Sequence, residues 1–133
     1  MIDVELLGTS LAEQAPAPDR VHRLCSLAAS SRGIHDGHVA VQYVDAEQIE
    51  RLNARHRGKA EPTDVLSFPI DGVEEPPGGA PRELGDIVIC PRHTVDLEEA
   101  IVHGMLHLLG MDHETDDGEM LALQDELLRE ARR

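Results

Sequence analysis

Aromatic side chains are nearly absent from this sequence of 133 residues, which contains one Phe, one Tyr and no Trp. A hydrophobic core must therefore be built from aliphatic side chains, alanine and methionine. Recognition of nucleic acid by base stacking is also disfavoured, because it needs aromatic platforms. The apolar content of 41%, together with 11 glycines, is nevertheless that of a globular protein, and the length fits one domain spanning residues 1–133.

Cysteine and long hydrophobic runs are scarce as well. Cys25 and Cys90 lie far apart and form no CxxC motif, which disfavours a disulfide framework and a thiolate zinc site. Both are expected to be buried, reduced thiols. No apolar run approaches the ~18 residues of a membrane span, and the acidic N-terminal segment is unlike a signal peptide. We therefore expect a soluble, cytoplasmic protein that does not bind a membrane.

Basic residues are also few. The chain has 12 Lys and Arg residues against 26 Asp and Glu residues, a formal net charge of −14. Such a charge repels polyanions unless the basic residues are gathered in one place, so a generic DNA-coating protein is disfavoured. One basic cluster does exist, formed by Arg51, Arg55, Arg57 and Lys59. It could hold a phosphate group; alternatively, its side chains only complement the dipole at the end of an exposed helix.

The hydrophobic pattern predicts strands and helices that follow one another along the chain. Strands are expected at residues 2–7, 38–44, 65–70 and 86–90, and helices at 20–31, at 46–56, from Thr94 or Asp96 to Leu109, and at 116–131. Asp19 and Asp45 are expected to cap helix N-termini, and Gly110 to follow the end of the third helix. Pro69 places its strand at a sheet edge or at a strand end. Residues 71–83, rich in Gly, Pro and Glu, predict a mobile loop.

The predicted helix 97–109 is apolar on nearly all sides and should be buried at the centre of the protein. His103 and His107 are the only polar side chains in its second half, and their spacing of four residues places them on one face. Gly110 lets the chain turn, so that His113 can return toward this pair. Three neutral imidazoles around one cation form an open tetrahedral zinc site, and this spacing favours such a site over hydrogen-bonded core histidines. The remaining histidines are assigned no role.

The segment HGMLHLLGMDH at 103–113 also matches the zinc-protease pattern H-E-x-x-H-x-x-G-x-x-H at its three histidines and its glycine. It differs at Gly104, where those proteases place the glutamate that acts as general base. Peptide hydrolysis by that mechanism is therefore disfavoured. A glycine at this position either lets a substrate or a backbone segment approach the metal, or allows close packing of the helix.

Segment 103–113, together with LNARHRGKAEPTDVLSFP at 52–69 and GDIVIC at 85–90, resembles the bacterial YbeY endoribonuclease family of rRNA maturation factors. The three blocks occur in the order typical of the family. Met111 and His56 stand where members usually have an aromatic residue, which affects the shape of the pocket rather than the metal site. The resemblance implies an α+β fold, in which a small mixed β-sheet packs with helices around a central zinc-binding helix.

The resemblance further implies a zinc-dependent endoribonuclease that holds one Zn²⁺ per chain, prefers single-stranded RNA and acts in 16S rRNA maturation and ribosome quality control. Its partners would be rRNA and the small ribosomal subunit or assembly proteins. The family's metal ligands correspond to His103, His107 and His113. Arg57 corresponds to the basic residue that the family keeps near the metal for catalysis and substrate binding. Arg55 and Lys59, in the same basic cluster, are expected to bind substrate.

Two other functions are compatible with the residues: a zinc hydrolase of another substrate class, and a non-catalytic ribosome assembly protein whose zinc is structural. A fourth protein ligand that closes the coordination sphere would favour the second. The acidic run from Asp112 to Glu119 indicates the solvated start of a helix. Alternatively, Asp112 orients a ligand imidazole, or a carboxylate accepts a proton during the reaction. The sequence leaves the attacking group, the cleavage site and the oligomeric state open.

Overall fold

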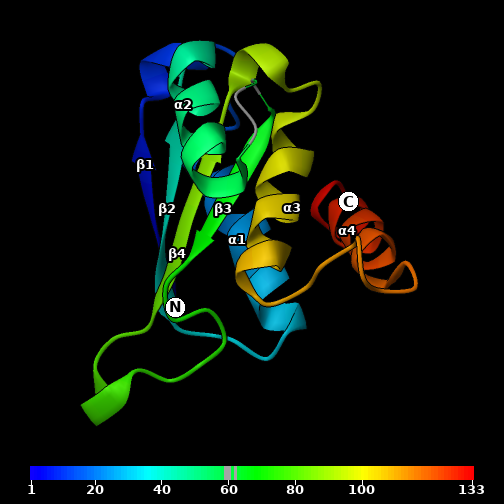
Figure 1. Ribbon diagram of the computed structural model, residues 1–133. Helices are drawn as coiled ribbons and strands as arrows, with labels where there is room; N and C mark the ends of the chain where they lie inside the picture. Colours follow the sequence, from blue (N-terminus) through cyan, green and yellow to red (C-terminus); the bar gives the residue numbers. More distant parts are fainter. Residues whose placement is uncertain (59–60, 62) are drawn as a thin grey trace.

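The computed structural model describes residues 1–58, 61 and 63–133 (Figure 1). Its elements are β1 (Ile2–Leu7), η1 (Thr9–Leu11), α1 (Pro18–Ser31), β2 (Gly37–Tyr43), α2 (Ala46–Arg57), β3 (Val65–Pro69), η2 (Pro77–Gly79), β4 (Glu83–Ile89), η3 (Pro91–His93), α3 (Leu97–Leu108) and α4 (Glu119–Ala131). Lys59, a predicted substrate contact, lies outside the described residues. No helix within the described ranges offers the long apolar stretch that a bilayer crossing requires.

The four strands form one sheet in the order β1-β2-β4-β3. β1, β2 and β4 run parallel, and β3 runs antiparallel to β4. β3 is an edge strand that ends at Pro69, which confirms the position that its proline predicted. β4 lies between β2 and β3, in agreement with its continuous apolar run. The mixed sheet with packed helices confirms the predicted α+β class.

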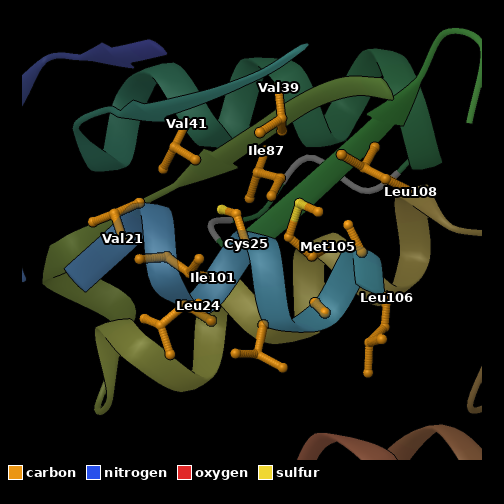
Figure 2. Close-up of a cluster of buried hydrophobic side chains, with 14 of the residues drawn as sticks. Val21, Leu24, Cys25, Val39, Val41, Ile87, Ile101, Met105, Leu106 and Leu108 are labelled. Carbon is orange, nitrogen blue, oxygen red and sulfur yellow. The ribbon is translucent and has the colours of Figure 1, made fainter. Parts of the chain in front are cut away.

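Helices cover both faces of this sheet (Figure 1). α1 and α3 pack on one face, and α4 packs against these two helices. The core on this face is almost entirely aliphatic, as the scarcity of aromatic residues predicted. In it, Val39, Val41 and Ile87 of the sheet meet buried side chains such as Leu24 of α1 and Met105 of α3 (Figure 2). The helix that carries two of the three motif histidines is thus buried at the centre, as expected.

α2 covers the opposite face, where Ile49 packs with Leu66 of β3 and Val88 of β4 in a smaller core. Asp45 caps this helix as predicted. Its carboxylate accepts the backbone N–H of Gln48 at 2.8 Å, and the Gln48 side chain accepts the N–H of Asp45 at 3.2 Å. This capping box defines where α2 starts, and therefore which residues of the basic cluster form its last turn.

The two cysteines are free and buried, as expected. Cys25 belongs to the core between the sheet and α1, whereas Cys90 belongs to the core under α2. Burial raises the pKa of the Cys25 thiol to about 12, so this thiol stays protonated and unreactive.

The predicted cap of α1 is wrong. α1 starts at Pro18, directly after Ala17, and Asp19 lies inside the first turn without capping it. Proline explains the difference, because its φ is already helical and it has no N–H that needs an acceptor. Asp19 contributes instead through its negative charge near the helix N-terminus.

The boundaries of α3 follow the prediction, whereas α4 starts later than expected. Asp96 caps α3 through a backbone N–H that lies 3.2 Å from its Oδ1 atom. Gly110 follows the end of α3 with a φ of +90°, which favours glycine. α4 starts at Glu119 rather than near residue 116, because Gly118 has a φ of +96° and cannot belong to the helix. The carboxylate of Asp116 accepts the N–H of Gly118 at 2.8 Å and stabilises this turn.

The predicted loop at residues 71–83 joins β3 to β4 and extends away from the sheet (Figure 1). β4 begins at Glu83, earlier than predicted, because its first residue already pairs with His38 of β2. Asp71 closes the base of the loop, since its Oδ2 atom accepts the N–H of Glu83 at 2.7 Å. The mobility of this loop stays a prediction.

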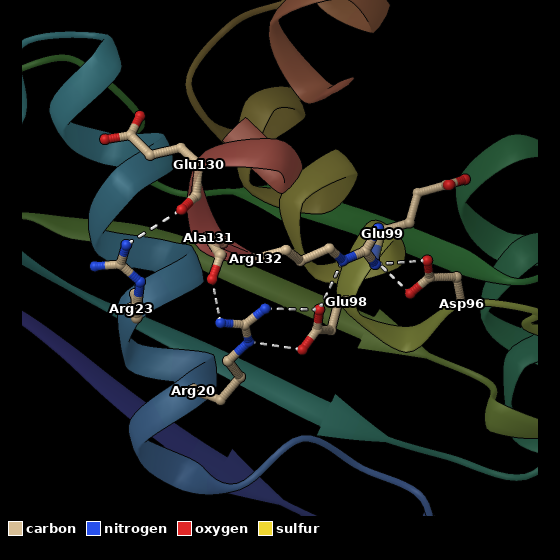
Figure 3. Close-up of polar contacts among 8 residues, drawn as sticks. All are labelled: Arg20, Arg23, Asp96, Glu98, Glu99, Glu130, Ala131 and Arg132. Atoms are coloured by element: carbon tan, nitrogen blue, oxygen red, sulfur yellow. Dashed lines mark hydrogen bonds and ion pairs between the residues drawn. The ribbon is translucent and has the colours of Figure 1, made fainter. Parts of the chain in front are cut away.

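An ion network joins α1, α3 and the C-terminal end of α4 (Figure 3). Arg20 of α1 donates from Nε to Glu98 of α3 at 2.7 Å, and it also donates to the carbonyl of Ala131 in α4. Arg132, just beyond α4, donates to Glu98 at 3.3 Å and to Asp96 at 2.9 Å. The hydrogen bond from Arg20 lowers the pKa of the Glu98 carboxyl. The network therefore fixes the end of α4 against α3.

Replacing Glu98 with glutamine is expected to lower the melting temperature of the metal-free protein by a few degrees at pH 7, because two arginines lose their anionic partner. The pKa of Glu98 is lower in the folded than in the unfolded chain, so its carboxylate stabilises the fold above the unfolded-state pKa of ~4.3. This contribution disappears as the pH falls through the folded-state pKa. Thermal unfolding between pH 7 and pH 3 should therefore show a difference from the parent that shrinks below about pH 4.

Glu99→Gln is the matched control for this experiment, because Glu99 is exposed in the same helical turn. This substitution removes one carboxylate near the N-terminus of α3 and breaks no ion pair of the network. An equal loss of melting temperature in both variants, or a loss that does not depend on pH, would contradict the role of Glu98.

Candidate metal centre

Three histidines meet where α3 ends. His103 and His107 project from the last two turns of α3, and His113 comes from the turn that follows. One ring nitrogen of each lies within 4.8 Å of the others. The left-handed conformation of Gly110 allows the reversal that returns His113 to the helix, as the spacing predicted. The three side chains could hold one metal ion.

Hydrogen bonds orient two of the rings. His103 Nδ1 lies 2.8 Å from Oε1 of Gln124 in α4, and His107 Nδ1 lies 3.0 Å from the carbonyl oxygen of Met111. Because these oxygens only accept hydrogen bonds, both Nδ1 atoms carry the proton. The lone pairs are then on the Nε2 atoms, which lie 3.1 Å from each other.

Two nitrogen lone pairs at this distance repel each other unless a proton or a cation lies between them. Burial, together with the charge of a protonated His103, lowers the pKa of His107, which disfavours a proton on Nε2 of that ring. A metal cation fits this arrangement, because neutral imidazole nitrogens are metal ligands. The three histidines are partly rather than fully buried.

The histidine group has three members within the described part of the chain, and no fourth His, Cys, Asp or Glu joins it. Structural zinc sites are usually closed by four protein ligands, whereas catalytic sites keep one position for water or substrate. The arrangement therefore has the form of a catalytic site.

The histidines open into a pocket of about 610 Å³. The last turn of α2, the segment leading into β3 and the turn after α3 form its walls. Arg57 lines this pocket, with Nη2 3.8 Å from Oε1 of Glu114, whereas Arg55 is exposed on α2 and is not part of the lining. A larger hollow of about 940 Å³ lies at the other end of α3, but its lining contains no histidine.

Gly104, between the first two histidines, is buried against the sheet. A Cβ atom at this position would lie 2.6 Å from Cγ2 of Ile87 in β4 and 3.3 Å from Oγ of Ser67 in β3. Of the two roles considered for this glycine, the structure supports close packing between helix and sheet. A protease glutamate has no space here, which strengthens the case against peptide hydrolysis by that mechanism.

Comparison with known proteins identifies the family. The model of the family described as Endoribonuclease YbeY matches residues 11–132. The chain belongs to the YbeY endoribonuclease family. Its membership agrees with the resemblance found in the sequence motifs, and it places the chain in a family of nucleases.

Curated YbeY relatives match over most of their length. The chain is 40% identical to an Endoribonuclease YbeY of Rubrobacter xylanophilus, over 97% of this chain and 96% of the relative. It is 47% identical to the Endoribonuclease YbeY of Acinetobacter baylyi, over 70% of this chain and 69% of the relative. The solution structure of TM1509 from Thermotoga maritima superposes with a TM-score of 0.54 at 28% identity, and covers 96% of this chain and 88% of TM1509.

His56 is a pocket residue to which the sequence analysis assigned no catalytic, metal-binding or substrate-binding role. It lines the pocket beside Arg57, and its ring packs on Phe68 of β3 with centroids 4.5 Å apart. The family resemblance had placed His56 at a position that affects the shape of the pocket. Its contact with Phe68 depends on how α2 lies over the sheet, which no local pattern reveals.

Substituting alanine for Gly104 is expected to destabilise this YbeY protein by on the order of 1 kcal/mol, because an overpacking cost of ~1–3 kcal/mol exceeds the helix-propensity gain of ~0.5–1 kcal/mol. Denaturant unfolding measures the loss. In an Ile87→Ala background the same substitution should cost less, because the clashing side chain is gone. An equal cost in both backgrounds would show that contact with Ile87 is not the cause.

Proposed function

We propose that this chain is a zinc-dependent endoribonuclease that cleaves single-stranded RNA in the cytoplasm, in 16S rRNA maturation and ribosome quality control. One observation carries the proposal: the Nε2 atoms of His103 and His107, 3.1 Å apart, lie with His113 in the wall of an open pocket that Arg57 also lines. Family membership supports RNA as the substrate.

His103, His107 and His113 would hold one zinc ion. Imidazole nitrogen suits Zn²⁺ better than Mg²⁺ or Ca²⁺, which prefer oxygen ligands. When bound, zinc supplies Lewis acidity toward a phosphoryl oxygen and lowers the pKa of water. The histidines themselves set the geometry, since hydrogen bonds at Nδ1 hold two of the rings with their Nε2 atoms toward each other.

Arg57 is the proposed catalytic and substrate-binding residue. Its ion pair with Glu114 is long at 3.8 Å, and both side chains are exposed to solvent, so the pair adds little stability. A phosphodiester can therefore replace Glu114 and accept the planar fork of guanidinium donors. The positive charge of Arg57 would then oppose the negative charge that develops on the scissile phosphate. Arg55 and Lys59 are proposed to bind neighbouring phosphates of the same strand.

The net charge of −14 opposes tight binding of free RNA. A protein with this charge gains little from counterion release along a long strand, because few of its side chains neutralise phosphates. The small ribosomal subunit or an assembly protein would therefore present the rRNA and supply the missing affinity.

Cleavage of a defined single-stranded RNA, compared with the same sequence in a duplex, tests the proposal. The zinc-loaded protein should cut the single strand, stop when a chelator is added and recover with zinc but not with magnesium. Equal cutting by a His107→Ala preparation would reveal a contaminating nuclease. Absence of cutting in both preparations would favour a non-catalytic ribosome assembly protein, and zinc-dependent hydrolysis of another substrate class would favour the alternative hydrolase.

A further inference from the structure

Gln124 is a buried polar side chain in the apolar contact between α4 and α3. Only 6% of its surface is exposed, and Met120, Leu127 and Leu128, which follow the same face of α4, are buried and apolar. Burying an amide costs free energy unless it is hydrogen-bonded. Oε1 of Gln124 lies 2.8 Å from Nδ1 of His103.

His103 needs one particular state of its ring to bind a metal together with His107. The proton must be on Nδ1, so that Nε2 can face Nε2 of His107 at 3.1 Å. Because Oε1 of Gln124 is the amide atom that lies against Nδ1, and an amide oxygen only accepts, this contact favours the Nδ1–H tautomer. His107 obtains the same tautomer locally, from the carbonyl of Met111 four residues later, whereas Gln124 is 21 residues from His103 and lies on another helix.

We propose that Gln124 is a positioning residue of the metal centre, which holds His103 in the tautomer and ring orientation that metal ligation requires. This inference rests on the proposed metal function. Partners of this kind fix ligand imidazoles in metal sites generally, and losing one typically costs ~10- to 100-fold in metal affinity.

The position of α4 against α3 determines whether Gln124 reaches His103. In the ion network, Arg132 and Arg20 hold the C-terminal end of α4 against α3 (Figure 3), and buried side chains such as Met120 and Leu127 hold the part of α4 that carries Gln124. Glu98, the centre of that network, lies in the first turn of α3, and His103 lies further along the same helix. The C-terminal helix is therefore part of the metal centre, although it contributes none of the three histidines.

Two variants of Gln124 separate positioning from packing. Gln124→Leu keeps the approximate volume and removes the acceptor, whereas Gln124→Glu keeps an acceptor and adds a buried charge. For each variant, the zinc dissociation constant is measured by competition with a chelator, the melting temperature is measured without metal, and the His103 tautomer is read from ¹⁵N chemical shifts in the metal-free protein.

Gln124→Leu should weaken zinc binding by ~10- to 100-fold, and its His103 should become a mixture of tautomers. Gln124→Glu should bind zinc at least as tightly as the parent although its melting temperature is lower, because a carboxylate also accepts from Nδ1–H and is costly to bury. Parental zinc affinity in Gln124→Leu, or an Nε2–H tautomer of His103 in the parent protein, would overturn the inference.

Arg132→Ala is the control for a general loosening of α4, because it breaks the ion network without touching His103. It should lower the melting temperature and leave zinc affinity closer to the parent value than Gln124→Leu does. If zinc affinity in all three variants simply follows the melting temperature, Gln124 has only a structural role. Absence of zinc binding in the parent protein would instead refute the proposed function, so the two failures are distinguishable.

Discussion

Replacing His107 with alanine is expected to abolish zinc binding and RNA cleavage together. The change removes one of the two Nε2 atoms that face each other at 3.1 Å, and leaves only His103 and His113 to hold the ion. Loss of a ligand should exceed the ~10- to 100-fold loss of affinity typical when only a partner of a ligand is removed. Zinc content after dialysis, chelator competition and cleavage of single-stranded RNA measure the effect.

His35→Ala is the matched control, because His35 is an exposed histidine remote in sequence from the site. It should bind zinc and cleave RNA like the parent. If His107→Ala retains full zinc content, the three-histidine site is wrong. If it loses zinc and still cleaves RNA at the parental rate, the cutting does not come from the three-histidine site, and a contaminating nuclease is its source.

Replacing Arg57 with alanine is expected to lower kcat for RNA cleavage by roughly 10²- to 10³-fold and to leave zinc affinity unchanged. Arg57 lines the same pocket as the histidines but is not a member of their group. Arg57→Lys should recover only part of the activity, because an ammonium group keeps the charge and lacks the planar fork of donors. Steady-state kinetics on a defined RNA and a zinc titration provide the two measurements.

Arg51→Ala provides the comparison for Arg57, since Arg51 belongs to the same helix and basic cluster but pairs with Glu47 at 3.0 Å, outside the pocket. It should change kcat little. Arg55→Ala is expected to affect KM more than kcat, because Arg55 does not line the pocket. Parental kcat in Arg57→Ala would refute its catalytic role, and equal losses in Arg51→Ala and Arg57→Ala would indicate a general effect of charge.

The sequence predicted the helices and strands well because their signals are local. Alternation and helical spacing of apolar residues located the elements, Asp45 as an N-cap marked the start of α2, and Pro69 marked an edge strand or a strand end. Prediction failed at Asp19, where Pro18 made a side-chain cap unnecessary, and at the start of α4, which depends on the conformation of Gly118. Where a helix starts depends on which of several neighbouring residues takes the position before its first turn, and these residues have similar preferences for that position.

The meeting of His103, His107 and His113 could also be predicted from sequence, because helical geometry and one glycine suffice to bring the three side chains together. The contacts that surround these histidines could not be predicted from sequence. His56 meets Phe68 across the contact between α2 and the sheet, and Gln124 reaches His103 from another helix. These contacts depend on how elements distant in the sequence pack together.

The amino-acid sequence alone determined the central helix and the three-histidine motif, because both depend on spacings within a short stretch of chain, and its resemblance to a known family indicated the α+β class. Only the tertiary structure decided which tautomers His103 and His107 adopt, which residues share their pocket and why residue 104 is glycine. The physical reason is that hydrogen bonds and steric contacts act through space. A Cβ atom 2.6 Å from Ile87, or an amide oxygen 2.8 Å from a ring nitrogen, exists only once α3, α4 and the sheet have packed together.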